Sequence, residues 1–260
     1  MRAHLIQLDI HWEDRAANFR SVESLIASVR VEPDDLILLP ELFDSGFSLN
    51  VRFTNDANAQ TDGFLASLAV RTRAFVLGGR TLLPDGAMRA FNLMSVKDPQ
   101  GHTLTDYAKI HPFSYGREPE SFAPGDRIVT FQWADRLCVC PAICYDLRFP
   151  ELFRIGMLRG AQVFAVGANW PSSRQAHWRS LLIARAIENQ AFVLGVNRTG
   201  KDPHLNYAGG SIAVDPRGNV LGELDADEAV LSVEIDPGLV EAWRAEFPAW
   251  RDVRLIAKPE

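Results

Sequence analysis

The sequence predicts a layered α/β fold. Along the first third of the chain, short apolar segments typical of strands alternate with segments whose apolar residues recur at helical spacing. This β-α-β-α-β order favours a sheet covered by helices. Further along, two pairs of strand-like segments are each joined by a turn that contains Asp, Pro and Gly, which predicts two hairpins.

The first third is expected to supply three strands and two helices. The expected strands are 2–10, 35–39 and 74–78, and the expected helices are 17–29 and 61–72. Asn18 and Ser21 lie near the start of the first helix and are available there as polar groups. The segment 35–39 is almost continuously apolar, as in a strand buried on both faces.

The rest of the chain continues the same pattern. The expected hairpins are 91–104 and 211–221, the strands are 138–143, 162–167, 191–196 and 229–235, and the helices are 151–158 and 177–190. No linker or low-complexity segment interrupts them. We therefore expect one domain over 1–247, followed by a polar tail over 248–260 that packs elsewhere.

Composition excludes several classes of protein. The chain has 260 residues, of which 47% are hydrophobic and 23% charged, which excludes a disordered or fibrous protein. The net charge is −6 with Lys and Arg scattered, which argues against binding to nucleic acid or an anionic membrane. No apolar stretch reaches the ~18 residues of a membrane span, and no signal peptide is evident. A small-molecule partner and a cytoplasmic location are expected.

The three cysteines are close together in the sequence. Cys138, Cys140 and Cys144 are an odd number, and their spacing is not the CxxC of a zinc or redox site. We expect free thiols, with Cys138 and Cys140 in the core of a strand.

Three expected strand ends carry side chains suited to acyl transfer, namely Glu41, Lys109 and Cys144. A thiol attacks as the thiolate, a carboxylate can take its proton, and an ammonium can stabilise an oxyanion. Taken singly, each has a structural explanation: a buried thiol, a capping or solvated acid and a surface lysine. Their shared placement at strand ends, where α/β folds gather ligand chemistry, favours a common site.

The flanking segments resemble the signatures of the carbon–nitrogen hydrolase (nitrilase) superfamily. They are LPELF at 39–43 with Gly46 and Phe47, YAKIH at 107–111, and ICYDLRFP at 143–150. Further similar strings are ANWP at 168–171, HW at 177–178 and ARAIENQ at 184–190, so the resemblance covers nearly the whole chain. Within the superfamily, CYDLRFP, ANWP and the FPAW at 247–250 resemble the omega-amidases, which hydrolyse the terminal amide of 2-oxoglutaramate and 2-oxosuccinamate.

The resemblance implies a fold and an assembly. It implies a four-layer α-β-β-α sandwich of the nitrilase type and a homodimer or higher homo-oligomer. It also implies that no metal or organic cofactor takes part.

The resemblance also implies roles for individual residues. Cys144 is similar to the family nucleophile, Glu41 to the general base and Lys109 to the cation that stabilises the tetrahedral intermediate, together with the backbone N–H of Tyr145. The superfamily has a second glutamate after the lysine, and we assign it to Glu118 rather than Glu120. The alternative for Glu118 is a solvated acid in a loop.

A 2-oxo acid substrate carries a carboxylate, for which Arg is a good bidentate partner. Arg174 and Arg198 are the candidates for this contact. Arg148 and Arg185 are expected to be structural, because each has an acid nearby in the sequence, Asp146 and Glu188 respectively. Three aromatic residues are expected to form the wall of a small pocket beside the thiol: Phe47, Tyr115 and Trp170.

Several alternatives remain open from the sequence. A Cys–His dyad using His111 or His177 is disfavoured, because either histidine can serve packing or a local hydrogen bond. Within the superfamily, a nitrilase, an N-carbamoyl amidohydrolase or a deaminated glutathione amidase would keep the same triad. An acyltransferase and a catalytically silent scaffold are the remaining alternatives, and the intact triad counts against the scaffold.

Overall fold

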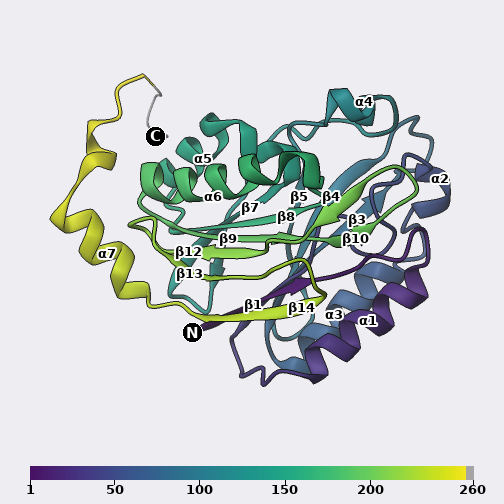
Figure 1. Cartoon of the computed structure of the whole chain (residues 1–260), viewed down its shortest axis with the longest axis horizontal. Coiled ribbons are helices and arrows are strands. Elements are labelled where there is room, and N and C mark those ends of the chain that lie inside the picture. Colours follow the sequence, from purple (N-terminus) through teal and green to yellow (C-terminus); the bar gives the residue numbers. More distant parts are fainter. Residues whose placement is uncertain (256–260) are drawn as a thin grey trace.

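Two six-stranded sheets pack face to face, with helices on both outer surfaces (Figure 1). The computed structural model describes residues 1–255. Figure 1 shows α1 and α3 against one sheet and α5 and α6 against the other. The predicted four-layer α-β-β-α sandwich is confirmed.

The first sheet has the strand order β14-β1-β2-β3-β4-β5. Its strands are β1 (Arg2–Gln7), β2 (Leu36–Leu38), β3 (Phe75–Leu82), β4 (Phe91–Lys97), β5 (Thr103–Ala108) and β14 (Ala229–Glu234). β1, β2 and β3 are mutually parallel, and the outer pairs are antiparallel. The covering helices are α1 (Arg15–Ala27) and α3 (Gln60–Thr72), and the short α2 (Val51–Thr54) precedes α3.

The second sheet has the order β13-β12-β9-β8-β7-β6. Its strands are β6 (Phe131–Trp133), β7 (Leu137–Ile143), β8 (Val163–Ala168), β9 (Phe192–Asn197), β12 (Ile212–Val214) and β13 (Val220–Glu223). Here β7, β8 and β9 are the parallel centre. The remaining elements are α4 (Glu118–Ser121), α5 (Pro150–Leu158), α6 (Gln175–Asn189), a separate hairpin of β10 (Thr199–Lys201) and β11 (Asn206–Ala208), and α7 (Pro237–Glu246).

Alternation along β2 explains why this strand is apolar throughout. Leu36 and Leu38 belong to the core cluster shared with the second sheet, whereas Ile37 and Leu39 pack with α1 and α3. A strand with both faces covered needs apolar residues at every position. The chain therefore leaves β2 in the interior, and Glu41 lies three residues after the strand ends.

The strands and hairpins expected from the sequence are present, with shifted ends. Both hairpins, β4–β5 and β12–β13, form as expected. The start of α1 differs, because Asp14 caps it by accepting the N–H of Ala17. Asn18 is buried instead, and its side chain donates to the carbonyls of His11 and Asp44.

The segment after 247 is partly described. Residues 249–252 form a 3₁₀ turn, and Trp250 packs against the core. The backbone N–H of Trp250 donates to the side-chain oxygen of Gln190 at 3.2 Å. Residues 256–260 of the expected tail lie outside the described residues. Within 1–255, none of the helices combines the length and apolarity needed to cross a membrane. The three cysteines are free thiols and are buried, and Cys138 and Cys140 lie in β7 as expected.

Candidate active site

Glu41 lies in the interior, three residues after β2, and its carboxylate is held on both oxygens. Oε1 accepts from Lys109 Nζ at 2.7 Å and from Asn92 Nδ2 at 2.8 Å. Oε2 accepts from the backbone N–H of Asn169 at 2.9 Å. The Asn169 side chain also donates to the Glu41 carbonyl at 2.6 Å, so the first sheet is joined to the end of β8 at this point.

Two glycines allow the Glu41 backbone to run through the interior. A Cβ on Gly79 of β3 would lie 2.2 Å from the Leu42 nitrogen and 2.8 Å from the Glu41 carbonyl carbon. A Cβ on Gly167 of β8 would lie 3.0 Å from the Leu39 oxygen. Both contacts are with backbone atoms. The contact at Gly79 leaves no room for a side chain, so this position requires glycine, whereas a side chain at Gly167 would push the Leu39 carbonyl by a few tenths of an ångström.

Lys109 follows β5 and is 1% exposed. Besides Glu41, its ammonium donates to Glu118 Oε2 at 2.8 Å and Oε1 at 3.1 Å. Glu118 begins α4, is fully buried and also accepts from Asn92 at 2.9 Å and from the Phe113 N–H. One ammonium is thus shared by two buried carboxylates.

Cys144 follows β7 at a sharp turn. Its φ of 45° lies in the left-handed region, which is strained for a residue with a side chain. Asp146 fixes the turn by accepting from the N–H groups of Ile143 and His111 and from the Tyr107 hydroxyl at 2.7 Å. The thiol is thereby directed away from the strand, and its Sγ lies 3.8 Å from the Asn169 carbonyl.

The electrostatics of the cluster follow from burial and from one shared cation. Burial alone would raise the pKa of Glu41, but the charge and hydrogen bond of Lys109, aided by two asparagines, hold it below its usual value. Burial raises the pKa of Glu118 despite Lys109. Burial would lower the pKa of Lys109, but the nearby carboxylates raise it.

The thiol of Cys144 is therefore neutral at rest. Burial raises its pKa well above the usual range, the charge of Glu41 raises it further, and Lys109 opposes the shift only in part. A neutral thiol needs a base that takes its proton when it attacks a carbonyl, and a cation nearby helps. The Glu41 carboxylate and the Lys109 ammonium are suited to these two tasks.

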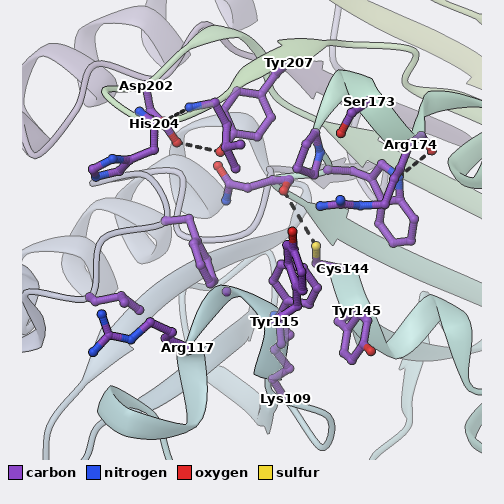
Figure 2. Close-up of a pocket in the computed structure, with 18 of the residues that line it drawn as sticks. Lys109, Tyr115, Arg117, Cys144, Tyr145, Ser173, Arg174, Asp202, His204 and Tyr207 are labelled. Carbon is purple, nitrogen blue, oxygen red and sulfur yellow. Dashed lines mark hydrogen bonds between the residues drawn. The ribbon is translucent and has the colours of Figure 1, made fainter.

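The thiol opens into a cavity of about 620 Å³. Five of the residues named from the sequence as substrate-binding line it: Phe47, Tyr115, Tyr145, Trp170 and Arg174. In Figure 2, Arg174 and Tyr207 lie above Cys144, Tyr145 lies below it, and Asp202 and His204 lie to the upper left. Phe47 also contacts the triad, since its ring centroid lies 5.6 Å from Lys109 Nζ.

The arginines are distributed differently from the expectation. Arg148 is not paired with Asp146, whose oxygens are taken by Tyr107 and His111; it lies over the Trp170 ring at 4.8 Å and lines the cavity. Arg185 does pair with Glu188, at 2.8 Å.

Arg198 is wrong as a candidate for the substrate carboxylate. It is fully buried behind the Tyr207 ring, 4.4 Å from its centroid, and does not line the cavity. Its guanidinium donates to the carbonyls of Ile10, Thr199 and Lys201. Arg198 therefore joins two backbone segments of the cavity wall.

Neither histidine pairs with the thiol. His111 Nδ1 is hydrogen-bonded to Asp146 at 2.8 Å, and His177 Nδ1 contacts Arg148 at 3.3 Å. Both therefore have the local partners expected of them, and the hydrogen bonds of the described residues provide no Cys–His dyad.

Sequence reasoning missed several residues of the site. Asn169 lies inside the ANWP string, so its position after a strand was an available signal. Asn92 lies in the interior of an expected hairpin strand, where only the fold reveals its contact with two glutamates. The cavity residues not foreseen include Trp12, Leu49, Phe113, Asp202, His204, Leu205 and Tyr207.

The four-layer fold, with a thiol, a carboxylate and an ammonium gathered at one cavity, defines an amidase-type hydrolase that acts on linear amides. The chain belongs to the carbon–nitrogen hydrolase family, whose sequence model matches residues 2–245. An omega-amidase from Yersinia enterocolitica is 34% identical, with 97% of this chain and 96% of the relative covered. A 2-oxoglutaramate amidase from Bacillus subtilis is also 34% identical, with 96% of each chain covered.

Solved structures agree with this assignment. A CN-hydrolase superfamily protein from Xanthomonas campestris, whose crystal structure has an arsenic adduct in the active site, is 33% identical to this chain. The two structures superpose with a TM-score of 0.91 over 99% of this chain and 98% of that one.

Proposed function

We propose that this protein is an omega-amidase that hydrolyses the terminal amide of a small 2-oxo dicarboxylate monoamide, such as 2-oxoglutaramate or 2-oxosuccinamate. The observation that carries the proposal is the buried Glu41–Lys109–Glu118 cluster beside Cys144, in a cavity that also holds Arg174. The two amidase relatives, at about one third identity, support the choice of substrate.

In the first half of the reaction, Cys144 attacks the amide carbon while its proton passes to Glu41. Proton transfer accompanies attack, because the thiol is neutral at rest and Glu41 is ionised. Negative charge then develops on the carbonyl oxygen, where the Lys109 ammonium and the Tyr145 N–H stabilise it. Glu41 returns the proton to the amide nitrogen, the C–N bond breaks, and ammonia leaves with a thioester on Cys144.

In the second half, water replaces ammonia. Glu41 takes a proton from the water, hydroxide adds to the thioester carbon, and the C–S bond breaks. The products are the dicarboxylate and Cys144, which recovers its proton. Glu118 is a positioning residue in this scheme, because it keeps the Lys109 side chain charged and directed at the site.

Arg174 is proposed to bind the substrate carboxylate at the opposite end from the amide. Its guanidinium carbon lies 5.5 Å from the centre of the Phe113 ring. The indole N–H of Trp170 donates to the backbone carbonyl of Arg174 at 2.9 Å. Arg148, whose guanidinium lies over the Trp170 ring, adds a second positive charge to the cavity lining. Two cations suit a substrate with a free carboxylate better than a simple nitrile or a neutral amide.

A substrate panel tests the proposal. Ammonia release is measured from 2-oxoglutaramate, 2-oxosuccinamate, glutamine, a simple nitrile and an N-carbamoyl amino acid. Selective turnover of the two 2-oxo amides is expected. Faster turnover of the nitrile or the carbamoyl compound would keep the triad and assign the protein to another branch of the superfamily.

An Arg174→Ala variant isolates the carboxylate contact. We expect KM for 2-oxoglutaramate to rise by about tenfold or more, since a charged hydrogen bond contributes roughly 1.5–3 kcal/mol. Arg179, which pairs with Glu223 on the surface, provides a matched control as Arg179→Ala. A cytoplasmic location, a homodimer and a single hydrolase domain over 1–247 remain part of the proposal.

A further inference from the structure

Asn92 contacts both glutamates of the buried cluster through a single amide group. It lies in β4 and is itself buried. Its Nδ2 donates to Glu41 Oε1 at 2.8 Å and to Glu118 Oε1 at 2.9 Å. The amide therefore gives one hydrogen to each of two buried carboxylates.

The fold places Asn92 directly beside Lys109. β4 and β5 are antiparallel, and the backbone N–H of Lys109 donates to the Asn92 carbonyl at 2.9 Å. Lys109 Nζ donates to the same two carboxylate oxygens, Glu41 Oε1 at 2.7 Å and Glu118 Oε1 at 3.1 Å. The two carboxylates are thus bridged twice, once by a cation and once by a neutral donor.

The charges around Asn92 fix the orientation of its amide. Ionised carboxylates only accept hydrogen bonds, so they select the amino group and repel the amide oxygen. That oxygen, Oδ1, is buried and accepts no hydrogen bond from the described residues. An unpaired buried acceptor costs free energy, which the two hydrogen bonds to charged groups must outweigh. The two donors, and not the amide oxygen, therefore tie this side chain to the cluster.

These donors leave one oxygen of Glu41 for the thiol. Oε1 accepts from both Lys109 and Asn92, which uses its two lone pairs. Oε2 accepts the backbone N–H of Asn169 at 2.9 Å, and its contact with the Asn169 side chain is long, at 3.4 Å. Cys144 Sγ lies 3.8 Å from the carbonyl of that same Asn169. Oε2 is thus the oxygen of Glu41 that has room for the thiol proton.

We propose that Asn92 is a positioning residue that keeps Glu41 ionised and oriented, so that Oε2 takes the proton of Cys144. The inference rests on the proposed role of Glu41 as the base, and it does not depend on which amide is the substrate. Without the two donors of Asn92, only Lys109 would separate two buried carboxylates, and such a pair binds a proton at higher pH. A Glu41 that already carries a proton cannot accept one from the thiol.

The pH dependence of alkylation tests the inference without the substrate. With iodoacetamide, the Cys144 sulfur bonds to the methylene carbon, iodide leaves, and Glu41 takes the thiol proton. Mass spectrometry that localises the label to Cys144 gives the rate. In the wild type the rate should fall only below the usual range of a glutamate. The reason is that, against the effect of burial, Lys109 and two asparagines hold the pKa of Glu41 below its usual value.

Two substitutions remove the donors. Asn92→Leu has nearly the same size and no donor, and Asn92→Asp replaces the amino group by a carboxylate oxygen. In both, the pH at which alkylation falls to half should rise by about one unit or more, since a hydrogen bond to a charged group shifts a pKa by that amount. Cys138 and Cys140 are buried and should stay unlabelled, which reports that the variants are folded. An unchanged midpoint in both variants would overturn the inference.

A double variant separates charge repulsion from loss of structure. Adding Glu118→Gln to Asn92→Leu removes one of the two buried negative charges. This change should restore folding where Asn92→Leu has lost it, and it should return the alkylation midpoint toward the wild-type value. A midpoint in the double variant as high as in Asn92→Leu, or a double variant that remains unfolded, would overturn the inference.

Ser95→Ala is the structural control. Ser95 lies in the same strand as Asn92 but on the opposite face, and it is also buried. Its hydroxyl accepts from Arg80 at 2.7 Å and donates to Asp106. The substitution therefore removes two hydrogen bonds from β4 without touching the cluster, and the midpoint should stay at the wild-type value. A shift as large as in Asn92→Leu would overturn the inference.

Turnover separates failure of this inference from failure of the proposed function. Ammonia release from 2-oxoglutaramate is measured over the same pH range for the wild type and Asn92→Leu. Wild-type turnover with unchanged alkylation midpoints would overturn the inference and leave the proposed function standing. Absence of turnover, with midpoints that shift as expected, would support the role of Asn92 and contradict the choice of substrate.

Discussion

Lys109 Nζ lies 2.7 Å from Glu41 Oε1, in an ion pair whose two side chains are at most 1% exposed. The same ammonium is bonded to Glu118, so the cluster carries two carboxylates and one cation. Burial, and then the charge of Glu41, which Lys109 offsets only in part, raise the pKa of the neighbouring thiol and keep it in its neutral form. We therefore propose that Glu41 takes the proton of Cys144 during attack, rather than that a thiolate is already present at rest.

Glu41→Gln should lower kcat for amide hydrolysis by at least about 10²-fold, because general base catalysis typically contributes 10²–10⁴-fold. Gln has nearly the size of Glu, and its side-chain oxygen can still accept the hydrogen bond from Asn92. Steady-state ammonia release measures the effect. Glu120→Gln changes a surface glutamate that pairs with Arg117; it is the control and should retain wild-type kcat. Comparable activity in the two variants would rule Glu41 out as the base.

Glu41→Gln should also lower the pKa of Cys144, because a negative charge that raises it is removed. The ultraviolet absorbance of the thiolate is followed against pH, with the Cys144→Ala spectrum subtracted. Thiolate should appear at lower pH in Glu41→Gln than in the wild type, which should show no thiolate near neutrality. Full thiolate absorbance at neutral pH in the wild type would contradict the assigned order of proton transfer.

Lys109→Met should abolish turnover and destabilise the protein by about 3–5 kcal/mol, because it leaves two buried carboxylates without their cation. Adding Glu118→Gln should recover part of this stability, since one buried charge is removed. Chemical denaturation of the single and double variants measures both effects. A double variant no more stable than Lys109→Met would show that charge repulsion is not the cause of the loss.

Gly79→Ala should displace Glu41, since the new Cβ would lie 2.2 Å from the Leu42 nitrogen. Loss of both stability and activity is expected. A Cβ added at Gly63, in α3, would meet no atom of the described residues within 4 Å, so Gly63→Ala should raise the free energy of unfolding by about 0.4–1 kcal/mol. Thermal unfolding and ammonia release distinguish the two. Full activity in Gly79→Ala would mean that Glu41 tolerates a shift of its backbone.

The layered fold could be predicted from the sequence because its strands are buried on both faces. Leu36, Ile37 and Leu38 are all apolar for this reason, and the Asp-Pro-x-Gly turns marked both sheet hairpins. The β10–β11 hairpin was missed because KDPHLN lacks alternation and contains proline. α7 did carry a signal that was overlooked, since Asp236 caps it and Pro237 occupies its first turn.

The three reactive side chains could be predicted because their chemistry coincides with strand ends. Glu41, Lys109 and Cys144 meet that condition. Arg148 was misassigned because closeness in sequence to Asp146 did not show that Tyr107 and His111 occupy that carboxylate. The cavity lining brings Trp12 together with Asp202, His204, Leu205 and Tyr207. These residues are distant from Trp12 in the sequence, so only the fold could reveal that they share a cavity.

The central claim is that Cys144 is the nucleophile for hydrolysis of an omega-amide. Ammonia release from 2-oxoglutaramate by the Cys144→Ala variant tests it most directly, once the variant has been shown to unfold at the same temperature as the wild type. The account predicts steady turnover by the wild type and none above background by the variant. Turnover that survives in Cys144→Ala would contradict the mechanism.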